Sequence, residues 1–176
     1  MKIKYILLSW DFIGAALLGI GVFFILPTWV SSSFAKDLYA IGISVLSIVF
    51  SVYFAALAII MSSSDDDFIK FLEEEEQYTT IVSSFEFSLL ILFLALIYSL
   101  GIYAFSSFWL TNNWSNQEKS WISVFIFLFF YGLFAAFNST RDAIKYSKFR
   151  TKFLNLKMQN DNTKQNAASA KGASGN

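Results

Sequence analysis

Four long apolar runs, separated by short polar segments, dominate the hydropathy pattern of the chain. The runs cover residues 5–29, 38–61, 81–110 and 120–137. An α-helix needs about 20 apolar residues to cross a hydrocarbon core of about 30 Å. Apolar side chains occur on all sides of each run rather than at alternate positions, which excludes transmembrane β-strands. The pattern predicts an all-α polytopic membrane protein with four transmembrane helices arranged as two helical hairpins.

The composition supports a lipid environment and removes most catalytic chemistry. Of the 176 residues, 56% are hydrophobic and only 15% are charged, whereas a soluble domain carries about a quarter charged residues. The sequence has no Cys and no His, so it lacks thiolate ligands, the commonest general base and the commonest metal ligand. It also has no glycine-rich phosphate loop and no metalloprotease motif. We therefore expect a non-enzymatic protein with no catalytic residue, metal or cofactor.

Basic residues lie almost entirely on one side of the four runs. Eleven of the 13 Lys and Arg residues come before the first run, between the second and third, or after the fourth: Lys2, Lys4, Lys70, Arg141, Lys145, Lys148, Arg150, Lys152, Lys157, Lys164 and Lys171. The other two are Lys36 in the outer segment 30–37 and Lys119 in the outer segment 111–119. Because basic residues near span ends resist translocation, we expect both termini and the middle loop in the cytoplasm.

An alternative interpretation of the first run is a cleaved secretion signal. Ser33, Phe34 and Ala35 form a small-x-small site after a start that contains lysine. The run is longer than a signal core of about 7 to 15 residues and contains Asp11, so a membrane span is favoured.

The segment 62–79, between the second and third runs, is strongly acidic. Its seven carboxylates are Asp65, Asp66, Asp67, Glu73, Glu74, Glu75 and Glu76. The segment predicts a short helix on which Phe68, Phe71 and Leu72 share one face. The ligand spacing and the glycine of a calcium loop are absent from it, so we expect no metal site.

A basic segment follows the fourth run. Residues 141–158 have apolar side chains near helical spacing and predict a basic amphipathic helix that begins at the inner membrane surface. Its basic side chains on the predicted docking surface are Lys145, Lys148, Arg150 and Lys152. Residues 159–176 lack large apolar side chains, and we expect them to be disordered. The predicted organisation is thus a transmembrane domain over residues 1–140, an amphipathic helix and a tail.

The two charged segments allow three interpretations. In the first, the basic helix binds anionic lipid headgroups, which contribute roughly 1 kcal/mol for each Lys or Arg near the surface. In the second, the acidic loop and the basic helix pair with each other. In the third, both segments bind a soluble protein. Seven carboxylates beside an anionic leaflet are repelled unless a basic group lies close to them. We therefore take the seven acidic and four basic residues as the predicted partner-binding set, and expect no direct binding of nucleic acid.

Three charged residues are expected at one depth near the inner ends of the spans. They are Asp11, Glu86 and Arg141. Ionisable groups inside spans usually face protein or water. The three residues form either a packing clasp or a proton-sensitive vestibule for cations. A small transporter that uses Asp11 and Glu86 is a further alternative, although the outer halves of the spans offer only tyrosines as titratable groups.

Small residues recur at four-residue spacing, which is typical of closely packed membrane helices. They are Ala15, Gly19, Ser47, Ser51, Ala55, Ala95, Ser99, Gly132 and Ala136. These residues serve either packing within one chain or contacts between copies, and the sequence does not separate the two. We expect the chain to self-associate. The phenylalanines between Phe125 and Phe137 are expected to face lipid, with a hydrophobic gate as the alternative.

One junction, together with the four-span plan, supports a resemblance. The sequence FAALAIIMSSSDDDFIKFLEEEE, residues 54–76, leads from a span through an acidic amphipathic segment towards the next span. It resembles small membrane proteins of bacterial anti-phage loci, such as the membrane subunits of Kiwa-type defence systems. The resemblance implies a bacterial inner-membrane protein that holds a cytosolic, nucleic-acid-acting partner. We therefore predict an oligomeric anchor or sensor for a soluble partner; the alternative is a pore-forming channel or holin-like effector.

Overall fold

The computed structural model describes residues 10–62, 66–74, 78–112 and 114–173. Its elements are α2 (Trp10–Ile25), β1 (Trp29–Ser31), α3 (Ser32–Ser62), α4 (Asp66–Glu74), α5 (Tyr78–Thr111), β2 (Asn116–Glu118) and α6 (Lys119–Ala173). Three stretches of helix are long and apolar enough to cross a membrane: Ser32–Met61, Tyr78–Thr111 and Lys119–Gln159. The predicted helices of the second, third and fourth runs are thereby confirmed, and the chain is an all-α protein of membrane type.

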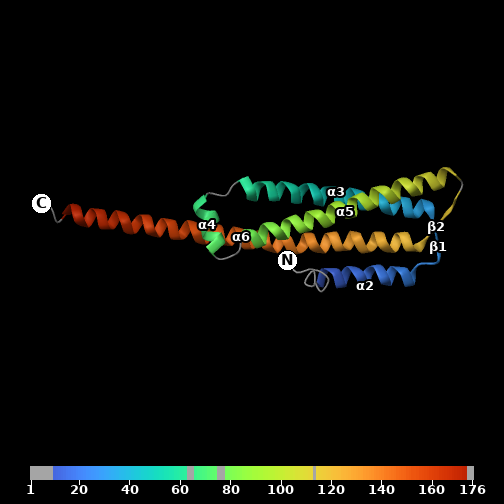
Figure 1. Ribbon diagram of the computed structural model, residues 1–176, viewed down its shortest axis with the longest axis horizontal. Coiled ribbons are helices and arrows are strands. Elements are labelled where there is room, and N and C mark those ends of the chain that lie inside the picture. The colour runs from blue at the N-terminus through green and yellow to red at the C-terminus, as the bar shows by residue number, and fades with distance from the viewer. Residues whose placement is uncertain (1–9, 63–65, 75–77, 113, 174–176) are drawn as a thin grey trace.

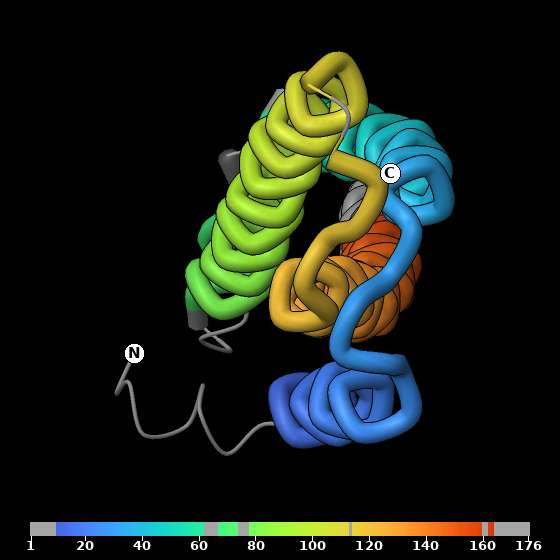
Figure 2. Tube along the Cα trace, turned by 90° about the vertical axis from the view of Figure 1, so that its right-hand side faces the viewer, coloured from blue at the N-terminus to red at the C-terminus, as the bar shows by residue number. Residues whose placement is uncertain are grey.

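The long helices are arranged around α6. Helices α3 and α5 pack on each other and on one side of α6, and α2 packs on another side of it. Figure 2 shows α6 between α2 and the α3–α5 pair. The strands lie at one end of this bundle and α4 at the other end, where α6 continues beyond the other helices (Figure 1). The bundle therefore has two different ends joined by an apolar middle.

Three buried apolar clusters follow one another along the bundle. The cluster beside the strands is centred on Tyr39, Ile102, Ile122 and Phe125. The middle cluster contains Leu46, Leu92, Ala95 and Ala136. The cluster beside α4 contains Ile60, Phe68, Leu72, Ile81, Phe85 and Tyr146. Every one of these clusters joins helices that are far apart in the sequence, so tertiary packing as well as lipid determines the arrangement.

Small residues bring α2 against α6. Ala15 and Gly19 are the buried residues of α2. A methyl group at Gly19 would approach the Phe127 side chain to 2.9 Å, and Ser123 of α6 donates a 2.5 Å hydrogen bond to the Gly19 carbonyl. Of the other small residues, Ala95, Ser99, Gly132 and Ala136 are buried, Ser47 is half-buried, and Ser51 and Ala55 are exposed. Most of the predicted small positions therefore serve packing within the chain.

Helix α2 ends earlier than the sequence pattern predicts. The expected span reaches residue 29, but the helix stops at Ile25. Pro27 follows; it has no N–H to donate and disfavours helical geometry at Leu26. At 16 residues, α2 is about 24 Å long.

The two outer segments, expected as loops, form a small antiparallel sheet. Strand β1 pairs with β2 in the register Trp29↔Glu118, Val30↔Gln117 and Ser31↔Asn116. The Ser32 N–H donates to the Ser115 carbonyl at 2.9 Å and extends the ladder. Gln117 is completely buried beneath it and accepts a 3.0 Å hydrogen bond from Ser106. The sequence pattern missed this sheet because three-residue strands have no measurable periodicity.

Helix α6 is continuous from Lys119 to Ala173. It runs without a break from the predicted span ending near residue 137 through the predicted helix over 141–158 into residues 159–173 of the predicted tail, while residues 174–176 lie outside the described part. The reason is that no Pro occurs after residue 119 and the first Gly after Gly132 is Gly172. Once a helix has nucleated, each further residue adds a hydrogen bond at little cost, so no break occurs where the apolar pattern ends.

The expectation that the phenylalanines of the fourth run face lipid is wrong for Phe125. Its side chain is 2% exposed and its ring packs edge-on against Tyr39, with 4.9 Å between ring centroids. It also lies against Gly42 of α3, where the absence of a side chain makes room for the ring. Phe137, by contrast, is exposed as expected.

Candidate functional site

Four of the seven predicted acidic residues belong to α4: Asp66, Asp67, Glu73 and Glu74. Asp67 and Glu73 are exposed, and the Glu73 carboxylate accepts a 2.8 Å hydrogen bond from Thr79 at the start of α5. Asp66 and Glu74 are the end residues of α4, and their side chains lie outside the described part, as do all of Asp65, Glu75 and Glu76. The described carboxylates therefore face outward from a helix that is held at the end of the bundle.

The apolar face of α4 holds it against α6. Phe68 is 3% exposed, and its ring centroid lies 5.5 Å from that of Tyr146 and 5.4 Å from that of Phe153. Phe71 packs on Phe153 at 5.6 Å, and Leu72 is completely buried. Aromatic pairs at these distances stabilise a contact beyond the burial of their surface. The acidic helix is thus fixed to the helix that carries the basic residues.

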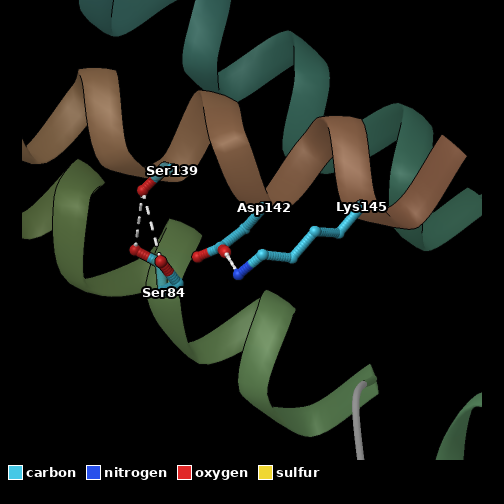
Figure 3. A network of polar contacts seen from close by, with 4 residues as sticks. All are labelled: Ser84, Ser139, Asp142 and Lys145. Atoms are coloured by element: carbon cyan, nitrogen blue, oxygen red, sulfur yellow. Dashed lines mark hydrogen bonds and ion pairs between the residues drawn. The ribbon is translucent and has the colours of Figure 1, made fainter. Parts of the chain in front are cut away.

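The predicted basic residues are exposed on α6 around this contact. They are Lys145, Lys148, Arg150 and Lys152. The Lys152 ammonium lies 5.7 Å from the centroid of the Phe71 ring, a cation–π distance. Lys145 forms a 2.8 Å ion pair with Asp142 on its own helix, which Figure 3 shows beside the serines that join α5 to α6. The structure therefore brings α4 and the basic segment together mainly through aromatic contacts.

The three charged residues expected near the inner ends of the spans do not form one ion-paired group. Asp11 accepts a hydrogen bond from the side-chain amide of Asn138, which joins α2 to α6. The Arg141 guanidinium lies over the ring of Phe137, 5.2 Å from its centroid, and Glu86 is exposed on α5. Within the described ranges, a salt bridge joins Asp142 to Lys145, and it involves none of these three residues.

A polar cluster that the sequence analysis missed joins α5 to α6. Buried Ser88 donates to the Ala135 carbonyl at 3.0 Å and shares a 2.5 Å hydrogen bond with buried Ser139. Ser139 also donates to the Ser84 carbonyl at 3.2 Å (Figure 3). Ser84 and Ser88 are four residues apart, and this spacing of small polar residues in an apolar run is the signal that could have revealed the cluster.

A second polar contact joins α3 to α6. The Tyr53 hydroxyl donates to the Ala136 carbonyl and is also hydrogen-bonded to Thr140. The serine cluster joins α5 to α6, and the pair of Asp11 and Asn138 joins α2 to α6. All three contacts lie towards the end of the bundle where α4 packs. Polar groups in lipid are costly unless they are paired, so these contacts fix the helices in one arrangement.

The middle of the bundle is filled by apolar side chains. Leu46, Leu92 and Ala95 all have 0% exposure. A methyl group at Gly132 would approach the Leu92 side chain to 3.2 Å, which shows how closely α5 and α6 lie there. In the described part of the chain, no group of three or more carboxylates is placed to hold a metal ion.

Comparisons with protein-family profiles, with curated proteins and with solved structures gave no match for this chain. The class that the fold defines is a helical membrane protein with an exposed helix extending from one end.

Proposed function

We propose that the chain is a non-enzymatic integral membrane protein that holds a soluble partner near the bilayer. The partner binds α4 and the part of α6 beyond the bundle. The observation that carries this proposal is the uninterrupted course of α6, which carries basic residues from its contact with α4 at the end of the bundle to the part that extends past the other helices (Figure 1).

The length of α6 favours a protein partner over lipid headgroups. Residues 119–141 of a helix span about 33 Å, close to the thickness of a hydrocarbon core of about 30 Å. From Arg141, Lys157 is about 24 Å further along the helix. The attraction of a lysine to an anionic leaflet falls off within a Debye length of about 8 Å. The headgroup layer adds about 5–8 Å on each side of the core, so Lys157 and the basic residues after it lie too far along the helix for headgroup binding in this geometry.

The proposed orientation follows the distribution of basic residues. The α4 end of the bundle and both termini lie in the bacterial cytoplasm, and β1 and β2 lie on the outer side of the inner membrane. Helix α2 is the fourth span in this proposal. Its described length of about 24 Å is somewhat below the thickness of the hydrocarbon core.

The pore alternative draws no support from the middle cluster. A water-filled path along the bundle would pass Leu46, Leu92 and Ala95, which have no exposed surface. Leakage of dye from liposomes containing the purified protein would instead favour the pore.

Site-specific photo-crosslinking in native membranes tests the proposal. A photoreactive residue at Lys152, which is exposed on α6, is expected to capture one soluble protein that mass spectrometry identifies in repeated experiments. A variant in which Lys148 and Arg150 are changed to Gln is expected to reduce that capture at least fivefold. The proposal predicts no capture of the same protein from Trp114, which lies beside β2 at the opposite end.

Capture of lipid alone from Lys152, or equal capture from Lys152 and Trp114, would count against recruitment. The role in phage defence that the resemblance implies is tested separately, by comparing phage infection of cells that carry the wild-type chain or the charge variant. Equal protection by both would count against a role of the basic segment in defence.

A further inference from the structure

One face of α6 carries large apolar side chains that are about half exposed or more. Phe137 is 61% exposed, Ile144 53%, Leu154 49% and Met158 57%. Phe137, Ile144, Thr151 and Met158 are each seven residues apart. Leu154 lies three residues after Thr151, as the second apolar position of a heptad does. Phe137, Ile144 and Met158 therefore recur at multiples of seven residues, as in a coiled-coil seam, with Leu154 beside them, while the other second heptad positions, Thr140 and Ser147, are polar.

This seam lies on a side of α6 that the bundle leaves open. Helix α2 contacts α6 through residues such as Phe127 and Asn138, α5 contacts it through Ser139, and α3 contacts it through Ala136 and Thr140. Phe137 and Ile144 fall outside these faces and are exposed. Figure 2 shows that the space beside α6 between α2 and α3 is not covered by another helix. Beyond the membrane, apolar groups on this side meet water unless another helix covers them.

We propose that a second copy of the chain covers this seam, so that two α6 helices pair in parallel from about Ile144, past the contact of Thr140 with α3, to Met158. Parallel pairing is required because copies in one membrane share one orientation. The helices would supercoil slightly to keep the seven-residue seam in contact. This inference concerns self-association and stands apart from the recruitment of a soluble partner proposed above.

The charges that flank the seam are compatible with a second copy. In a parallel coiled coil, the residue just before a first seam position contacts the partner helix at the residue numbered five higher. Ala143 then faces Lys148 of the second copy, Arg150 faces Asn155, and Lys157 faces Asn162. Each of these pairs joins one basic residue to one neutral residue, so no like-charged pair opposes the association. Lys145 and Lys152 lie at outward positions of the heptad.

Single-cysteine crosslinking tests the seam, because the natural chain contains no cysteine. Thr151→Cys and Met158→Cys variants are oxidised in native membranes with copper–phenanthroline and separated on non-reducing gels. Seam positions of a parallel pair bring the Cα atoms within about 7 Å, which permits a disulfide. The matched control is Leu156→Cys, which is 43% exposed but lies off the seam.

We expect the two seam variants to form a crosslinked dimer at least tenfold faster than Leu156→Cys. Adding Ile144→Asp to Thr151→Cys should reduce dimer formation at least fivefold, and because Ile144 is exposed the bundle stays folded. Equal rates at positions 156 and 158, or monomer at every position, would overturn the proposal. Photo-capture of a soluble protein from Lys152 is measured independently, so failure of the seam and failure of recruitment are distinguishable.

Discussion

Single glycines determine how closely the membrane helices approach one another. A methyl group at Gly42 would lie 2.3 Å from the Phe125 ring, whereas nothing lies within 4 Å of the corresponding position at Gly101. Phe125 is buried against Tyr39 and has little freedom to move. The two glycines are therefore a matched pair, one in a helix contact and one in an open position.

We predict that Gly42→Ala destabilises the protein and Gly101→Ala does not. In both cases Ala raises helix propensity by about 1 kcal/mol. At Gly42 the displaced Phe125 ring adds an overpacking cost of about 1–3 kcal/mol, which cancels or exceeds that gain. Thermal unfolding in detergent, followed by circular dichroism, measures the difference. A melting temperature for Gly42→Ala equal to or above that of Gly101→Ala would contradict the close contact.

The hydrogen bond beneath the small sheet gives a second residue-scale prediction. Ser106 and Gln117 are both completely buried, and Ser106 donates to the Gln117 side-chain oxygen at 3.0 Å. Ser106→Ala leaves that oxygen without its donor, and we expect a loss of about 1–3 kcal/mol in the free energy of unfolding. Combining it with Gln117→Met should recover most of the loss, because the buried amide is then also removed. Strictly additive losses in this double-mutant cycle would show that the two side chains do not interact.

Among the elements, α4 shows how an acidic helix is held at the bundle end. Its contact depends on Phe68, Phe71 and Leu72, while Asp67 and Glu73 remain exposed. The hydrogen bond from Thr79 to Glu73 ties the end of α4 to the start of α5. Apolar packing therefore sets the position of α4, and its described carboxylates stay exposed.

We predict that Phe68→Ala releases α4 from α6. Removal of a buried phenylalanine ring costs about 3–5 kcal/mol, here concentrated in the contacts with Tyr146 and Phe153. Amide hydrogen exchange within residues 66–74 should become at least tenfold faster, while exchange in the middle of α5 stays unchanged. Lys70→Ala is the control, since Lys70 is exposed on the same helix. Equal exchange in both variants would mean that the aromatic contact does not hold α4.

The apolar helices could be predicted from sequence, but their ends and contacts could not. Long uniform apolar runs specify α3, α5 and the first part of α6 because lipid permits little except helix. The end of α2 depends on Pro27, a local signal that the hydropathy pattern overlooks. Among the described side chains, Asp11 is hydrogen-bonded to Asn138 and forms no ion pair with Arg141. This pairing depends on which faces of α2 and α6 meet, and a hydropathy pattern does not specify those faces. The outward acids of α4 were visible in the sequence, whereas its docking on Phe153 was not.

For the whole molecule, the central question is which end of the bundle faces the cytoplasm. The distribution of basic residues predicts that the strands lie on the outer side, and the cysteine-free chain makes this orientation testable. Ser31 and Asn116 are directly opposed in the antiparallel ladder. The hydrogen bonds on either side, from Ser32 to Ser115 and from Lys119 to Thr28, leave Ser31 and Asn116 as a non-hydrogen-bonded pair. Such pairs have Cα atoms about 4.5 Å apart, within reach of a disulfide.

We predict that a variant with Ser31→Cys and Asn116→Cys forms an internal disulfide in bacterial cells without added oxidant. The bacterial periplasm is oxidising and the cytoplasm is reducing, so spontaneous formation reports an outer location as well as the strand pairing. Thiol alkylation of whole cells followed by mass spectrometry measures the oxidised fraction, which should fall sharply in cells that lack the periplasmic disulfide-forming enzymes. If the thiols stay reduced in cells yet form the disulfide when purified membranes are oxidised, the strands pair but face the cytoplasm. In that case the basic segment of α6 would lie outside the cell, and recruitment of a cytosolic partner would be ruled out.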